Sequence, residues 1–237
     1  MCHYSESLGI IMDLKCNIQE TDLPDVLLVE AFIYETMKDF NKMFDTLREA
    51  LLINPNNHEA LEQIWISVEF SKKYEESIRL HQSIIDHNPY SYLAWYNLGH
   101  AHSCLGEYEK AVEALEYSFL INPQFEQGYL DCAELCLQIG QYEKALGSYL
   151  EASEMFGPDP ELVVYMSECL IKLGRYKEAK LRLQKAAIND PYNEEVFYYL
   201  GECHLQEGNF NKAIKCYLNA IDLADCREEF HASIARA

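Results

Sequence analysis

The sequence predicts an all-α protein, an α-solenoid of stacked antiparallel helix pairs, and three observations support this prediction. Asn-Pro pairs recur every 34 residues, at 54–55, 88–89 and 122–123, and Asp190-Pro191 lies two periods beyond the last of them. A glycine-led stretch keeps the same period, as GEYEKA (106–111), GQYEKA (140–145), GRYKEA (174–179) and GNFNKA (208–213). Apolar residues between these signals recur at helical spacing. Such a fixed period is typical of a repeat architecture.

Each period is expected to hold two short helices. Between 92 and 125 the first apolar stripe is Trp95, Leu98, Ala101 and His102, and the second is Tyr108, Ala111, Val112, Leu115 and Phe119. Gly106 separates the two stripes, and Asn122-Pro123 ends the second, because proline disfavours a helical residue before it. Helices this short are marginal alone in water, so they must gain stability by stacking on their neighbours.

The period divides the chain into six expected repeats, at 24–57, 58–91, 92–125, 126–159, 160–193 and 194–227. Residues 1–23 are expected to form a leading segment with one helix around Leu8, Ile11, Met12 and Leu14. Residues 228–237 fit the start of a seventh repeat or a capping helix. Because they are short for a polar cap, we expect the chain to be a piece of a longer protein.

Several residues at fixed places in the period resemble the tetratricopeptide repeat (TPR) signature. The third repeat has Trp95-x2-Leu98-Gly99-x2-His102, then Ala111-x3-Leu115 and Pro123, with His102 in place of the usual tyrosine. The sixth repeat is similar, with Phe197, Leu200, Gly201, His204, Ala213 and Tyr217. The resemblance spans 24–227 and implies a right-handed superhelix. In this family Gly99 and Ala111 mark the close approach of two helices.

The first two repeats depart from this pattern. Glu30 takes a position that is usually apolar, and Trp65 takes the position of Gly99. Lys38 and Lys72 replace the turn glycine, while Met43 and Ser77 replace the small alanine. Helix pairs are still expected there, but the packing of the second pair must open to admit Trp65.

Composition excludes several classes of protein. No window approaches the roughly 18 apolar residues of a membrane helix, and the first residues lack the features of a secretory signal. The nine cysteines lie mostly in apolar helical patterns, which indicates reduced thiols and a cytoplasmic location. The net charge of −20 disfavours nucleic acids and anionic membranes. A basic partner fits better, although an acidic surface can also serve solubility alone.

The negative charge is concentrated on the first helix of each pair. The first 14 residues of the six repeats hold 15 acidic residues and one basic residue, Lys172. The TPR resemblance implies that first helices line a concave groove, so this groove would be acidic and rich in tyrosine. The expected partner-binding residues are Tyr96, Asn97, His100, Asp131, Glu134, Gln138, Tyr165, Glu168, Tyr198, Tyr199 and Glu202. Carboxylates pair with Lys and Arg, and tyrosine faces can hold cations.

Two interpretations of this surface stay open, a groove for a partner or a solvated inner face with partner contacts made elsewhere. Some TPR domains grip a C-terminal carboxylate with groove lysines and arginines. The matching positions here include Glu62, Asn97 and His100, so that subclass is rejected.

No pattern for catalysis or cofactor binding emerges. Cys132, Cys136, Cys169 and Cys203 could suggest a zinc site, but these slots normally hold small core residues. His100 and His102 are two residues apart on a helix and do not share a face. We expect no enzyme, no cofactor and no metal. The predicted function is a non-enzymatic protein–protein interaction scaffold. Alternatives are a self-assembly module or a regulatory arm of a larger protein, and the oligomeric state is left open.

Overall fold

The computed structural model describes residues 2–223, and the expected start of a seventh repeat at 228–237 lies outside them. The described part contains thirteen α-helices, one short 3-10 helix and no strand. The elements are α1 (Cys2–Asn17), η1 (Glu20–Asp22), α2 (Leu23–Thr36), α3 (Phe40–Ile53), α4 (His58–Ser71), α5 (Tyr74–His87), α6 (Tyr92–Cys104), α7 (Tyr108–Ile121), α8 (Glu126–Gln138), α9 (Tyr142–Phe156), α10 (Pro160–Lys172), α11 (Tyr176–Asn189), α12 (Glu194–Gln206) and α13 (Phe210–Leu223).

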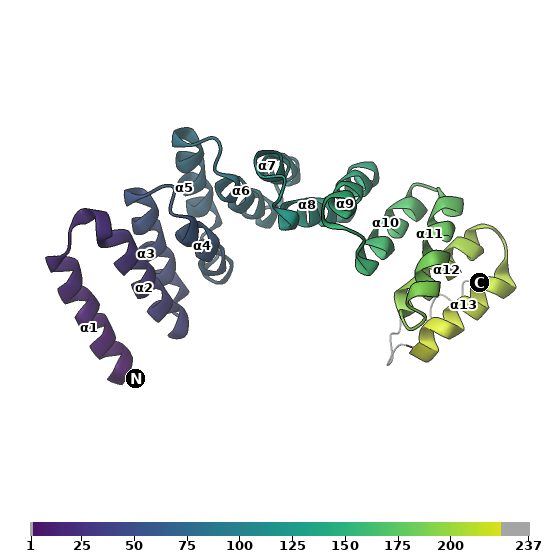
Figure 1. Ribbon diagram of the computed structural model, residues 1–237, viewed down its shortest axis with the longest axis horizontal. Coiled ribbons are helices and arrows are strands. Elements are labelled where there is room, and N and C mark those ends of the chain that lie inside the picture. Colours follow the sequence, from purple (N-terminus) through teal and green to yellow (C-terminus); the bar gives the residue numbers. More distant parts are fainter. Residues whose placement is uncertain (1, 224–237) are drawn as a thin grey trace. The chain divides into compact units, whose positions relative to one another are not determined.

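Consecutive helices pack against one another within two compact units, Met1–Gly128 and Tyr129–Ala237. In the first unit α1, α2 and α3 lie side by side as neighbours, and in the second unit α10 to α13 do the same (Figure 1). The predicted all-α solenoid of stacked helix pairs is therefore confirmed.

The recurring Asn-Pro pair ends a helix by a specific local geometry. Asn54, Asn88 and Asn122 are the C-cap residues of α3, α5 and α7, and their backbone leaves the helical region. Each side-chain Oδ1 accepts a hydrogen bond from the backbone N–H two residues later. Asp190 does the same after α11, with the N–H of Tyr192 at 3.0 Å. Such Asx turns favour loops over helix continuation, which explains why Asn or Asp recurs there.

The turn between the two helices of a pair uses a left-handed residue. Its φ angle is +74° at Gly106, and Gly140, Gly174 and Gly208 have similar values. In the first two repeats Lys38 (φ 57°) and Lys72 (φ 61°) adopt the same conformation despite their side chains. The turn geometry is thus kept where the glycine is lost, at some cost in backbone strain.

The small residues of the third and sixth repeats allow two helices to approach closely. A Cβ atom added at Gly99 would lie 2.7 Å from Leu115 Cγ, and one added at Gly201 would lie 2.6 Å from Tyr217 Cδ1. Real Cβ atoms do not come so close to other atoms. The expected close approach at Gly99 is confirmed, and Gly201 repeats it between α12 and α13.

The second repeat is packed differently. Trp65 stands where Gly99 stands in the third repeat, and α4 makes far fewer contacts with α5 than α6 makes with α7. His81, at the position of Leu115, is fully buried in α5. The sparse contact between α4 and α5 agrees with the expected opening of this helix pair to admit Trp65.

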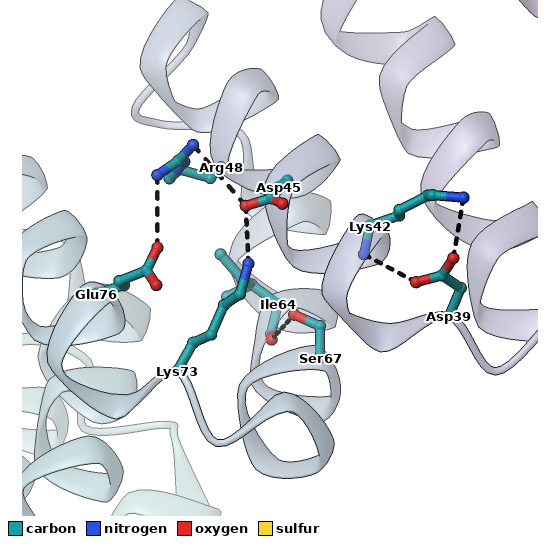
Figure 2. A network of polar contacts seen from close by, with 8 residues as sticks. All are labelled: Asp39, Lys42, Asp45, Arg48, Ile64, Ser67, Lys73 and Glu76. Atoms are coloured by element: carbon teal, nitrogen blue, oxygen red, sulfur yellow. Dashed lines mark hydrogen bonds and ion pairs between the residues drawn. The ribbon is translucent and has the colours of Figure 1, made fainter.

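Ion pairs connect α3 to the start of α5 around this open pair. Lys73 Nζ lies 3.0 Å from Asp45 Oδ1, and Arg48 Nη1 lies 3.6 Å from Glu76 Oε2 (Figure 2). The ammonium of Lys73 also lies 4.9 Å from the centroid of the buried Phe44 ring. These ion pairs hold α5 against α3. The buried hydroxyl of Ser67 donates a hydrogen bond to the backbone carbonyl of Ile64 (Figure 2).

Glu30, the other unusual residue, is tied to the leading helix. It is 8% exposed, forms an ion pair with Lys15 of α1, and accepts a hydrogen bond from Tyr34 Oη at 3.3 Å. The carboxylate in an apolar position is thus explained by its role in attaching α1 to α2.

Candidate partner-binding surface

In the first unit, the expected groove residues lie on α6 and have different environments. Asn97 is only 2% exposed, and its Nδ2 donates to the Leu61 carbonyl of α4 at 2.8 Å. Its amide therefore joins two first helices and is not available at a surface. Tyr96 and His100 are partly exposed, and their rings meet edge to face at 4.4 Å.

Two aromatic residues that sequence reasoning did not select complete this cluster. The ring centroid of Trp65 in α4 lies 5.0 Å from that of His100, and the ring centroid of Phe125 lies 4.9 Å from that of Tyr96. Trp65 was not among the expected groove residues, and Phe125 stands at the last position of its repeat. Helix α6, which holds no acidic residue, thus presents an aromatic group in the first unit.

In the second unit, carboxylates and tyrosine hydroxyls are paired between helices. Tyr199 Oη of α12 donates to Glu168 Oε2 of α10 at 2.8 Å. Burial raises the pKa of Tyr199, and the nearby Glu168 carboxylate raises it further. Tyr217 Oη donates to Glu202 Oε1 at 2.8 Å. These carboxylates therefore support the packing of α10, α12 and α13 while remaining partly exposed.

The remaining predicted residues are more open. Glu134 and Gln138 of α8 are exposed, and Gln138 Nε2 donates to Glu134 Oε1 at 3.0 Å. Asp131, one turn earlier on α8, is half-buried. The Tyr198 ring of α12 lies 5.2 Å from that of Tyr199 and 5.9 Å from that of Tyr217.

Tyr165 of α10 is an exposed ring among the carboxylates of the second unit. It is 40% exposed, and its ring stacks on Tyr149 of α9 with centroids 5.6 Å apart. Burial raises the pKa of the Tyr165 phenol, and four carboxylates raise it further. They are Glu195, Glu161, Glu134 and Asp159. These acids come from α8, α10, α12 and the N-cap of α10, so three first helices place negative charge around one exposed ring.

Tyr149 supports this ring and was missed by sequence reasoning. It lies on a second helix, at the position that Leu115 holds in the third repeat, and is 2% exposed. Burial raises its pKa, with nearby Glu134 and Glu168 adding to the effect. The aromatic character of this core position was the signal that could have identified it.

The cysteines at the core positions have the chemistry of buried thiols. Cys132, Cys136, Cys169 and Cys203 are each 0% exposed. Burial raises the pKa of Cys169 and of Cys203 to about 12, so both are protonated at neutral pH. Residues 2–223 hold no group of three His, Cys, Asp or Glu side chains arranged to bind a metal ion.

Comparison with known proteins agrees with this architecture. Models of the tetratricopeptide repeat match residues 24–57, 92–125 and 170–237. The chain belongs to the tetratricopeptide repeat family. No curated protein matches this TPR chain in sequence.

Solved structures similar to the TPR chain share its fold at low sequence identity. YrrB, described as a TPR protein with an unusual peptide-binding site, has a TM-score of 0.66 at 17% identity, covering 81% of this chain and 98% of YrrB. PilF of Pseudomonas aeruginosa has a TM-score of 0.64 at 14% identity, covering 92% and 99%. MamA of Desulfovibrio magneticus RS-1 has a TM-score of 0.59 at 18% identity, covering 69% and 92%.

None of the helices within 2–223 combines the length and the apolar character needed to cross a membrane.

Proposed function

We propose that this TPR protein is a non-enzymatic interaction scaffold whose second unit binds a basic peptide or protein surface on its first helices. The TPR fold itself suggests a protein–protein interaction scaffold. The observation that supports a basic partner is the Tyr165 ring, half exposed and surrounded by carboxylates from α8, α10 and α12. A guanidinium or ammonium group over that ring would gain from the ring face and from the carboxylates together.

Two further features fit this proposal. Tyr149 packs under Tyr165 and Tyr199 donates to Glu168, so these contacts hold both side chains in place and little ordering is needed on binding. The similar protein YrrB is described as having a peptide-binding site. We place the scaffold in the cytoplasm, because its free cysteines include four fully buried thiols that a reducing compartment would preserve.

Charge reversal at the exposed carboxylates tests the proposal most directly. Glu168 and Glu202 accept hydrogen bonds from tyrosines, so their reversal would disturb packing as well as charge. Glu134 and Glu161 are exposed and better suited. The matched control is Glu151→Lys/Glu154→Lys, on exposed positions of α9 with the same change in net charge.

The measurement is the fluorescence anisotropy of a labelled oligo-arginine peptide, titrated with each variant at low and at physiological salt. Glu134→Lys/Glu161→Lys is expected to weaken binding about tenfold or more at low salt, and the control by much less. Equal affinities for the two variants would show that only the net charge matters and would refute a site around Tyr165.

Self-assembly is the second candidate, and one observation favours it. A hollow of about 450 Å³ between α1 and α2 is lined mainly by apolar side chains, among them Ile10, Leu14, Val29 and Ile33. Ile10 and Val29 are more than half exposed. A second copy could add a helix here as consecutive helices do within the chain. Light scattering over a range of concentrations tests this candidate, and a dimer lost in Leu14→Glu/Val29→Glu would support it.

A further inference from the structure

The segment from the end of α10 through α11 carries a concentration of positive charge in a strongly acidic chain. Six of the chain's 19 Lys and Arg residues lie between 172 and 185, where Glu178 is the one acidic residue. They are Lys172, Arg175, Lys177, Lys180, Arg182 and Lys185. This segment is therefore opposite in sign to the first helices discussed above.

Four of these six cations form no ion pair with a carboxylate among residues 2–223, although Arg182 helps to lower the pKa of Glu178. Arg175 makes a bidentate pair with Glu178 at 2.9 and 2.7 Å, and Lys180 Nζ lies 2.5 and 2.6 Å from the two oxygens of Glu207. Lys172, Lys177, Arg182 and Lys185 are not within ion-pair distance of any described carboxylate. Their charge is available at the surface.

Apolar side chains lie on the same face of α11. Only Ala179 and Leu183 of this helix are buried, whereas α7 buries six residues. Leu181 is 57% exposed and Ile188 is 80% exposed. Residues 177, 181, 185 and 188 follow helical spacing, so cations and apolar side chains alternate along one stripe.

A hollow beside this stripe is lined by both apolar and basic side chains. Its volume is about 440 Å³, and its walls come from α11 and from Val163 of α10. Leu181 and Ala186 line it together with Val163, and its polar lining is Arg182, Lys185, Asn189 and Glu178, whose carboxylate is paired with Arg175. Arg182 reaches toward Met166, with Nη1 3.9 Å from Sδ, and forms no bidentate pair. The hollow can hold an apolar side chain with carboxylates on either side of it.

We propose that this stripe, defined by Lys177, Leu181, Arg182, Lys185 and Ile188, is a docking surface for a short acidic segment of a partner protein. The segment would place a large apolar side chain in the hollow and its flanking carboxylates on Arg182 and Lys185. This surface is separate from the one around Tyr165, and its partner has the opposite charge. One chain would then connect a basic and an acidic protein.

The size of the stripe favours a peptide over other polyanions. A helix of 14 residues is about 20 Å long, so a bound segment of that length meets mainly positive charge. A nucleic acid or an anionic bilayer is much larger than the stripe. Parts of it would come within the Debye length, about 8 Å, of the acidic helices and be repelled by them. Neither of them supplies a single apolar side chain for the hollow.

The test is a selection of phage-displayed random peptides on the whole chain, run in parallel on three proteins. They are the wild type, Arg182→Glu/Lys185→Glu, and the control Lys212→Glu/Lys215→Glu, which makes the same charge change at exposed positions of α13. The wild type and the control are expected to enrich peptides with an apolar residue between acidic ones. The α11 variant is expected to bind the selected peptide at least about tenfold more weakly at physiological salt.

Further measurements keep the outcome decisive. Circular dichroism melting checks the fold, and Arg182→Gln/Lys185→Gln replaces the reversal if the latter unfolds. Leu181→Ser and a peptide whose apolar residue is changed to serine should each weaken binding, which a purely ionic attraction would not show. These variants leave Glu134 and Glu161 intact, so their result is independent of the oligo-arginine experiment.

Three results would overturn the proposal. The first is no enrichment of acidic peptides, or equal affinity for the α11 variant and the control. The second is tighter binding of phosphatidylserine vesicles or of single-stranded RNA, lost in the α11 variant. The third is a dimer of the wild type that the α11 variant abolishes, which would make a second copy the occupant.

Discussion

The ring of Tyr217 in α13 lies directly over the Cα of Gly201 in α12, and a Cβ added at Gly201 would be 2.6 Å from Tyr217 Cδ1. Tyr217 is fully buried and donates its hydroxyl to Glu202. The ring therefore cannot move away without losing both its packing and its hydrogen bond.

Gly201→Ala is expected to lower the free energy of unfolding by about 1–3 kcal/mol, because the added methyl group overpacks the helix seam. Gly147→Ala is the matched control, since Gly147 lies inside α9 with nothing within 4 Å of an added Cβ. That change should raise stability by up to about 1 kcal/mol through helix propensity. Urea unfolding measures both, and equal shifts for the two variants would contradict the close approach.

His81 predicts a pH dependence of stability. It is fully buried, its Nδ1 lies 2.8 Å from the Ser77 carbonyl oxygen, and its Nε2 has no hydrogen-bond partner among the described residues. Burial lowers its pKa from 6.5 to about 4. The native state therefore holds the neutral ring, while the unfolded chain takes up a proton near pH 6.5.

The contribution of neutral His81 to the free energy of unfolding should thus be complete above pH 6.5 and fall as the pH decreases toward 4. The loss over that range is about 3 kcal/mol. Denaturant unfolding at several pH values, compared with His81→Leu, isolates the effect from the carboxylates. Leucine is the residue at the equivalent position of the third repeat, Leu115. Parallel pH profiles for the two proteins would refute the prediction.

Lys15 and Glu30 predict how α1 is attached. Lys15→Ala leaves the mostly buried Glu30 carboxylate without its ion-pair partner, so the loss of stability should be about 1–3 kcal/mol. In the Lys15→Ala variant, the increase in hydrogen-exchange rate over the wild type should be larger in α1 than in α13. The double variant Lys15→Ala/Glu30→Leu should recover most of the loss, because the equivalent positions hold Ile64 and Leu98. Failure of that recovery would mean that the pair does more than neutralise a buried charge.

Two substitutions of Tyr165 distinguish whether oligo-arginine contacts the ring face or the hydroxyl of this residue. Tyr165→Phe keeps the stack on Tyr149 and should leave oligo-arginine binding within about twofold of the wild type. Tyr165→Ala should weaken it by roughly threefold to thirtyfold, the range of a cation–π contact. Anisotropy titration at constant salt measures both. A weaker Phe variant with an unaffected Ala variant would exclude a ring-face contact.

The repeat period made most of the helix positions predictable. Asn122-Pro123 and Gly106 carry their structural meaning locally, as an Asx turn and a left-handed residue, so their effect can be inferred without knowledge of neighbours. The same is true of the loosened second pair, because a tryptophan at the position of Gly99 cannot fit the usual approach.

The functional surface was less predictable. Asn97 has the residue type and position of a groove contact, but its amide is used on the Leu61 carbonyl of the preceding first helix. Tyr149 was overlooked because it lies on a second helix, although its ring stacks against that of Tyr165. Both outcomes depend on contacts between residues of different helices, which periodicity does not describe.

The sequence alone determined the repeat period, the helix pairs, their turns and the segregation of charge onto first helices. These follow from backbone preferences and residue order, which act over a few residues. Only the tertiary structure decided which tyrosine meets which carboxylate, as Tyr199 meets Glu168 across 31 residues, and which cations of α11 remain unpaired. Such pairings depend on side-chain directions where stacked helices meet, and the fold must exist before those directions are defined.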